Sequence, residues 1–240
     1  MSHRASSPAA SLRPTLAPAL LGLAAVLALF EFTSLDLLVQ DQFFDFARGR
    51  WIVDRDETWG RAIFYNGPKH LVWLCALTAL ALAAGPAAWR ERWQLSRRGL
   101  WVAVLTLTTL PALAGLGKNL TNVFCPSEIR RYGGAVPYVA LCGAYPVDDR
   151  PTSRGHCFPA GHASGGFALI ALALVRPSRR WRRGGILVGL TLGWWMGGYQ
   201  MLKGAHYLSH TLVTMLLAWV VLAMWQRVLA PRAASVEKMP

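Results

Sequence analysis

The stretch HCFPAGHAS, residues 156–164, lies between two long apolar regions and carries few charges. Pro159 and Gly161 interrupt any regular structure before them, and an apolar run over 163–175 follows. We therefore expect His162 in the first turn of a helix, where unpaired backbone N–H groups and the helix dipole favour an anion. The same residues also fit a turn in which the histidine only caps a helix. The rest of the chain has to distinguish an anion site from a cap.

The composition is that of a membrane protein. Of the 240 residues, 54% are hydrophobic and only 15% are charged, which is too apolar for an ordinary soluble domain. Six runs approach the roughly 20 residues that span a bilayer, and they cover 15–36, 70–89, 99–117, 163–176, 184–203 and 206–226. We therefore expect an all-α polytopic membrane protein, with one domain over 15–226 built as a bundle of six transmembrane helices. The flanking residues, 1–14 and 227–240, are expected to be cytoplasmic tails, the first of them disordered.

The net charge of +13 would suit a nucleic-acid partner, but its distribution indicates a membrane orientation instead. The arginines cluster in short segments, 90–98 and 176–183, and short basic loops mark the cytoplasmic side. Both termini are then inside, in agreement with an even number of spans. The longer segments 37–69 and 118–162 hold most of the acidic residues and are expected outside, with the aromatic-rich 37–69 lying along the outer leaflet.

Three segments at the expected outer ends of the spans carry the reactive side chains. They cover 118–131, 156–164 and 203–210, and together they hold Lys118, Arg130, Arg131, His162, Lys203, His206 and His210. The last two histidines are four residues apart and would share one face of a helix, which Lys203 joins if that helix is continuous. Cations that hold phosphate oxygens, a nucleophile and a general acid are what phosphoryl transfer requires.

The order and spacing of these residues resemble the type-2 phosphatidic acid phosphatase superfamily, over roughly residues 60–226. That family has the motifs K-x6-R-P, P-S-G-H and S-R-x5-H-x3-D. Lys118-x6-Cys125-Pro126 has cysteine in place of the arginine, and Pro159-Ala160-Gly161-His162 has alanine in place of the serine. Tyr199-Gln200-x5-His206-x3-His210 keeps only the histidine of the third motif.

The resemblance implies a role for each matching residue. His206 would be the nucleophile that forms a phosphohistidine, and His162 the general acid for the leaving alcohol. His210 stands where the family has an aspartate, and its neutral imidazole would accept a hydrogen bond from His206. Phosphate would be held by Lys118 and by the turn at Ala160 and Gly161, and the charge of the missing arginines would come from Arg130, Arg131 and Lys203.

The resemblance also implies the setting of the reaction. The enzyme would be metal-independent, would need no cofactor, and would act on a phosphorylated membrane lipid at the periplasmic face of a bacterial inner membrane. Undecaprenyl pyrophosphate, phosphatidylglycerol phosphate, phosphatidic acid and lipid A are candidate substrates. Transfer of the phosphate to another lipid, instead of to water, is an alternative within the family.

Two further alternatives lie outside the family. His206 and His210 have metal-ligand spacing, and His156, Cys157 and His162 are possible additions, although Lys118 and Lys203 would repel a cation. A lipid-binding membrane protein with a decayed site would use the histidines as interfacial polar residues. Chelator sensitivity and phosphate release distinguish these readings from a metal-independent phosphatase.

The resemblance also bears on the four cysteines. If the first two motifs border one phosphate, Cys125 and Cys157 lie close together in an oxidising compartment, and we predict that they form a disulfide. Cys142 is the competing partner, and Cys75 is expected to stay reduced inside a span.

Overall fold

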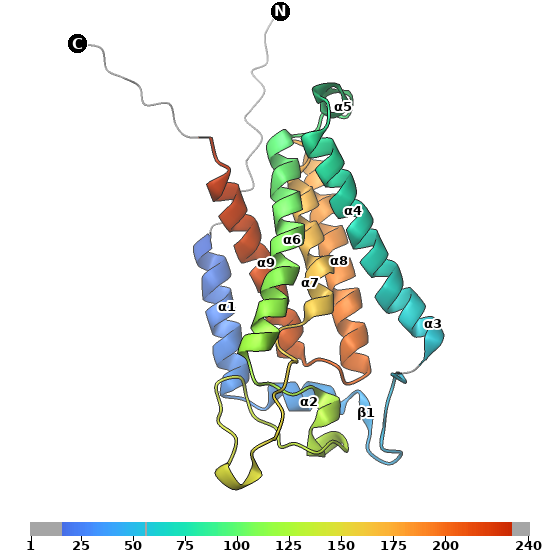
Figure 1. The fold of residues 1–240 in the computed structure, drawn as a ribbon, viewed down its shortest axis with the longest axis vertical. Coiled ribbons are helices and arrows are strands. Elements are labelled where there is room, and N and C mark those ends of the chain that lie inside the picture. The colour runs from blue at the N-terminus through green and yellow to red at the C-terminus, as the bar shows by residue number, and fades with distance from the viewer. Residues whose placement is uncertain (1–15, 56, 232–240) are drawn as a thin grey trace, which may run out of the picture.

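The structure is a computed structural model that describes residues 16–55 and 57–231 and is mostly helical (Figure 1). The expected tail 1–14 and most of the tail 227–240 lie outside the described residues. The α-helices are α1 (Leu16–Glu31), α2 (Leu35–Asp41), α3 (Thr58–Gly60), α4 (Gly67–Ala84), α5 (Ala87–Arg92), α6 (Arg97–Leu120), α7 (Gly161–Ala168), α8 (Arg179–Leu202) and α9 (Leu208–Val228). A π-helix η1 (Arg61–Asn66) joins α3 to α4, and the 3₁₀ helices are η2 (Pro126–Glu128), η3 (Arg130–Tyr132), η4 (Val147–Asp149) and η5 (Leu169–Leu174). A short hairpin pairs β1 (Phe44–Asp45) with β2 (Arg50–Trp51).

The all-α prediction is confirmed, but the count of six spans is not. Among the described residues, three helices are long and apolar enough to cross a membrane: Thr58–Ala84, Arg97–Leu120 and Leu208–Val228. A fourth results if α1 and α2, which are bent by 74° relative to each other, count as one span. The expected spans at 163–176 and 184–203 correspond to a shorter apolar helix, Gly161–Leu174, and to α8, whose first turns carry an arginine cluster.

Helix α7 occupies the middle of the bundle, where it packs against α6, α8 and α9 (Figure 1). Its close neighbour α8 has glycines on the shared face. A Cβ at Gly193 would lie 2.1 Å from the ring of Phe167 in α7, and one at Gly189 would lie 2.4 Å from the backbone N of Ile170 in η5, which directly follows α7. Small residues of this kind let two helices approach closely. The start of α7, with His162, is thereby fixed at one end of the bundle centre.

The connections at that end form a cap, which we define as residues 35–53 and 121–160 (lower part of Figure 1). An aromatic cluster holds the two parts together and includes Phe44, Phe124, Tyr132 and Tyr207. The segment expected along the outer leaflet, 37–69, is therefore divided. Its first part packs into the cap, and its last part is already helix from Thr58 onward.

The cap holds the turn between α8 and α9 by three hydrogen bonds to backbone carbonyls. The Gln40 side chain donates to the Met201 carbonyl over 2.7 Å, Val53 N–H donates to the Leu202 carbonyl over 3.3 Å, and Ser127 N–H donates to the Gly204 carbonyl over 3.0 Å. Because these contacts reach the last turn of α8 and Gly204 itself, the end of α8 and the reversal are fixed relative to the cap.

Candidate active site

His206 and His210 come from different local structures. Helix α8 ends at Leu202, and the chain reverses at Gly204, whose φ of 70° is in the left-handed region that favours glycine. Helix α9 begins at Leu208, so His206 precedes it and His210 lies in its first turn. The expectation that both histidines and Lys203 share one continuous helix face is therefore wrong, because the glycine reversal separates the two helices.

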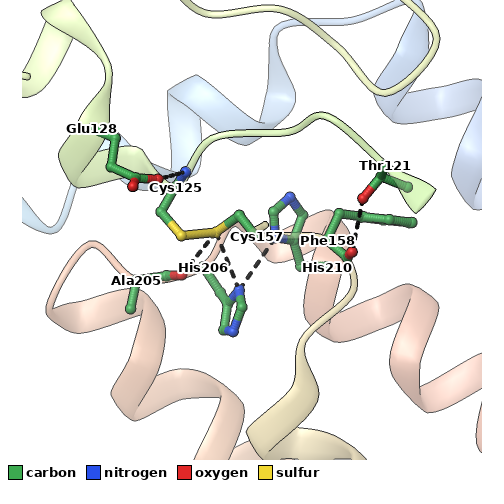
Figure 2. The surroundings of a disulfide bond; sticks show 8 residues. All are labelled: Thr121, Cys125, Glu128, Cys157, Phe158, Ala205, His206 and His210. Atoms are coloured by element: carbon green, nitrogen blue, oxygen red, sulfur yellow. Dashed lines mark hydrogen bonds between the residues drawn. A yellow bond between two sulfur atoms is a disulfide. The ribbon is translucent and has the colours of Figure 1, made fainter. Parts of the chain in front are cut away.

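The two histidines nevertheless form a buried pair. Their Nδ1 atoms lie 3.3 Å apart, and the residues are only 3% and 2% exposed. The Sγ atom of Cys157 is 3.5 Å from the same Nδ1 of His206. Figure 2 shows the second ring nitrogen of His206 turned away from both partners. One Nδ1 must donate and the other accept, and if His206 donates, its Nε2 keeps a free electron pair.

The surroundings of His206 disfavour its charged form. Burial, followed by the charges of His210, Lys118 and His162, lowers the pKa of His206 well below its ordinary value. The imidazole is therefore neutral at neutral pH. A neutral imidazole is the nucleophilic form, so no proton has to be removed before it can attack.

A disulfide joins Cys125 to Cys157, the pair expected from the sequence (Figure 2). Cys75 and Cys142 are free. A backbone hydrogen bond from Cys157 N–H to the Val123 carbonyl, 2.9 Å long, runs beside it. The disulfide therefore ties the segment after α6 to the segment before α7, and it places a sulfur directly against the histidine pair.

Lys118 lies against the first turn of α7. A Cβ added to Gly161 would be 3.1 Å from Cε and 3.7 Å from Nζ of this lysine, so glycine is what allows the approach. The amides of that first turn have no acceptor within the helix because of their position. Burial and then the positive charges of Lys118, Lys203 and Lys69 lower the pKa of His162 to about 4, so an anion bound here would favour its protonated form. An ammonium group and helix-start amides thus meet beside a histidine, an arrangement that suits a phosphate.

Three of the expected phosphate ligands have partners elsewhere in the structure. Ala160 N–H donates to the Thr214 hydroxyl over 3.0 Å, so it is not available to an anion. The guanidinium groups of Arg130 and Arg131 form ion pairs within the cap, the first with Asp149 and the second with Asp41. The cap acids compete for these arginines, and the sequence alone does not show that pairing.

One cation and one ring from η1, Arg61 and Tyr65, were not predicted from the sequence. The Tyr65 ring lies 4.2 Å from the His162 ring, and the Lys203 ammonium lies 5.4 Å from the same tyrosine ring. Burial and then repulsion from Arg55 and Arg61 lower the pKa of Lys203, which places these two arginines near it. π-Helices are frequent at functional sites. The four-residue spacing of Arg61 and Tyr65 was the one local signal for this part of the site. An ordinary helix face shows the same spacing, so the signal does not identify a site.

Asp36 is a second residue that the sequence did not single out. Its carboxylate accepts hydrogen bonds from the Ser209 backbone N–H, 2.9 Å away, and from the Ser209 hydroxyl, and it is 4% exposed. Ser209 lies next to His210 in the first turn of α9. Asp36 therefore fixes the start of the helix that carries the histidine pair and acts as a positioning residue.

We expect Asp36→Ala to lower the free energy of unfolding by about 1–3 kcal/mol, because it leaves the buried Ser209 donors without an acceptor. Phosphate release should fall with it, since the start of α9 is no longer held. Thermal unfolding and turnover in detergent measure both effects, with Asp148→Ala, an exposed cap acid, as the matched control. Equal behaviour of the two variants would show that the Asp36 contact does not hold the helix start.

Comparison with known families identifies one matching family model. A family model described as the PAP2 superfamily matches residues 99–233, which is more than half of the chain. The matched region contains Lys118, His162, His206 and His210. No curated protein and no solved structure gave a match to the chain.

Proposed function

Because the chain belongs to the PAP2 superfamily, whose members are phosphatases, we propose that it is a membrane phosphatase that releases phosphate from a lipid through a phosphohistidine at His206. The buried His206–His210 pair beside Lys118 and the start of α7 is the observation that carries the proposal. The family supports phosphatase chemistry in general. The lipid substrate, the membrane face and the covalent intermediate are our inference.

The proposed reaction has two steps. The Nε2 atom of His206 attacks the phosphorus atom in line while its Nδ1–H donates to His210, which stabilises the positive charge that develops on the ring. Lys118 and the first-turn amides of α7 hold the phosphate oxygens, and the negative charge of the bound phosphate favours the protonated form of His162, which then protonates the departing alcohol oxygen. Water then attacks the phosphohistidine, His162 accepts its proton, and inorganic phosphate leaves.

In this proposal, cations from η1 and from the α8–α9 turn replace the charge of the two arginines that are missing from the motifs. Lys203 lies between the rings of Tyr65 and Tyr199, at 5.4 and 5.0 Å, and Arg61 lies 5.8 Å from the ring of Tyr65. These cations stand on the side of His162 that faces η1, where a head group would approach. A lysine binds phosphate as a point charge, so we expect looser positioning than a two-pronged arginine gives.

Phosphate release from a panel of lipids tests the proposed function. Purified full-length protein in detergent is given undecaprenyl pyrophosphate, phosphatidylglycerol phosphate, phosphatidic acid and lipid A, with and without a chelator. We expect chelator-insensitive release from at least one lipid. A phosphorylated lipid product without free phosphate would identify a transferase, and no turnover on any substrate would favour a lipid-binding protein.

The proposed orientation predicts that the cap faces outward. A cysteine introduced at Asp148, on η4, should react with a membrane-impermeant thiol reagent in intact cells, and one at Arg180 should react only after lysis. Both substitutions are made in Cys142→Ser protein, since Cys142 is itself exposed. Labelling of the Arg180 position in intact cells would place the histidine pair on the cytoplasmic side.

A further inference from the structure

Three buried side chains converge on one point, and one of them is the proposed nucleophile. The ligand atoms of Cys157, His206 and His210 all lie within 4.8 Å of one another. Zinc bonds of about 2.3 Å to sulfur and about 2.05 Å to nitrogen, at tetrahedral angles, imply ligand separations of about 3.6 Å for S···N and about 3.3 Å for N···N. The measured separations are 3.5 Å from Cys157 Sγ to His206 Nδ1 and 3.3 Å between the two Nδ1 atoms.

We propose that reduction of the Cys125–Cys157 disulfide converts this corner into a zinc site. The ligands are Cys157 Sγ, His206 Nδ1 and His210 Nδ1, and Cys125 Sγ is the fourth. The Cα atoms of the two cysteines are 5.2 Å apart, so both sulfurs stay at this corner once the bond between them is broken. A set of two thiolates and two imidazoles is a closed tetrahedral donor set for Zn²⁺.

The oxidised protein lacks the charge that a cation needs. A disulfide sulfur is neutral and a poor ligand, and the positive charge of Lys118 acts on both histidines. Reduction by a dithiol adds two electrons and two protons to the disulfide, and the reductant becomes a disulfide in turn. Zinc binding then displaces the two thiol protons, and the two thiolates balance the charge of the ion.

The two sulfurs differ in solvent exposure, so a reductant attacks one of them first. Cys125 is half-buried, whereas Cys157 is fully buried. A dithiol therefore attacks Cys125 Sγ and expels Cys157 as the thiolate, directly against His206. The second thiol of the reductant then releases Cys125, and the fourth ligand becomes available.

Zinc at this corner would stop the phosphatase reaction, a consequence that rests on the proposed function. A neutral imidazole carries one hydrogen. Metal on Nδ1 of His206 forces that hydrogen onto Nε2, and the nitrogen that should attack phosphorus has no free electron pair. The same ion also replaces the hydrogen bond between His206 and His210. The reduced, zinc-bound protein is therefore an inhibited form.

Cobalt provides a readout of the site that does not depend on activity. Full-length protein in detergent is reduced with a phosphine, freed of reductant and titrated with Co²⁺, whose thiolate charge-transfer absorption reports sulfur ligation. We expect one Co²⁺ per chain with this band in reduced protein, no band in oxidised protein, and displacement by one equivalent of Zn²⁺. Cys157→Ser should weaken metal binding by at least about 100-fold, whereas Cys142→Ser should bind as the wild type does.

The outcomes separate the metal site from the proposed function. Metal binding by a protein that never releases phosphate from any lipid would overturn the phosphatase and keep the site. Phosphate release by a protein whose reduced form shows no cobalt–thiolate band would overturn the metal site and keep the phosphatase. This conclusion holds whether or not the reduced protein remains folded. Cys125→Ser, which frees the Cys157 thiol without any reductant, should bind through the three remaining ligands. A Cys157→Ser protein that binds as tightly as the reduced wild type would also overturn the site.

Discussion

His206→Ala is expected to lower phosphate release by about 10³-fold or more, as removal of a nucleophile does in other covalent enzymes. The imidazole forms the proposed covalent intermediate, so alanine leaves no atom to accept the phosphoryl group. The fold should persist, because the turn is held mainly by backbone contacts to the cap.

A trapping measurement and a matched control accompany this variant. Rapid quenching with a labelled substrate should trap an acid-labile phosphoprotein from the wild type and none from His206→Ala. His70→Ala, which removes an exposed histidine of α4, is the matched control and should form the phosphoprotein normally. A folded His206→Ala protein that releases phosphate at the wild-type rate would remove this residue from the mechanism.

His162→Ala is expected to have an effect that depends on the leaving group. With a lipid substrate the departing alcohol needs a proton, so turnover should fall by about 10²–10⁴-fold, the usual contribution of a general acid. With a nitrophenyl phosphate the leaving group needs no proton, and formation of the phosphoenzyme should be much less affected. The ratio of the two rates isolates proton donation from a general loss of structure.

Single-turnover kinetics with both substrates measure that ratio. Tyr65→Phe is a suitable control because it keeps the ring that packs against His162 and removes only the hydroxyl. An equal loss on both substrates in His162→Ala would indicate that the histidine supports the structure of the helix start. In that case another group would have to protonate the leaving oxygen.

The sequence predicted the pairing of His206 with His210 through a helix that does not exist there. Four-residue spacing brings two side chains together on a helix, and the reversal at Gly204 followed by the start of α9 happens to bring them together as well. The Cys125–Cys157 pair was accessible to sequence reasoning because both motif segments had to meet at one phosphate. Local motifs therefore indicated which residues meet, though not the backbone that brings them there.

The remaining site residues depend on contacts that no local pattern encodes. Asp36 meets Ser209 across more than 170 positions of the chain, and its own neighbourhood reads as the end of an apolar run. Arg130 and Arg131 looked available because their cap partners, Asp149 and Asp41, are also remote in sequence. The count of six spans is not confirmed for a related reason. Helix α8 is glycine-rich and packs closely on its neighbours, so its composition reflects contacts between helices as much as contact with lipid.

The contacts between the cap and the α8–α9 turn decide which segments of the chain have to stay together in a chimaera. The region shared with the PAP2 superfamily begins at residue 99, yet the groups that grip the turn from the other side, Gln40, Val53 and Asp36, all precede it. The proposed catalytic unit is therefore larger than the region matched by the family model. Grafting residues 99–233 onto another membrane anchor would carry over the reactive side chains but not the segment that holds their turn. An exchange between relatives therefore has to move residues 35–53 together with residues 99–233.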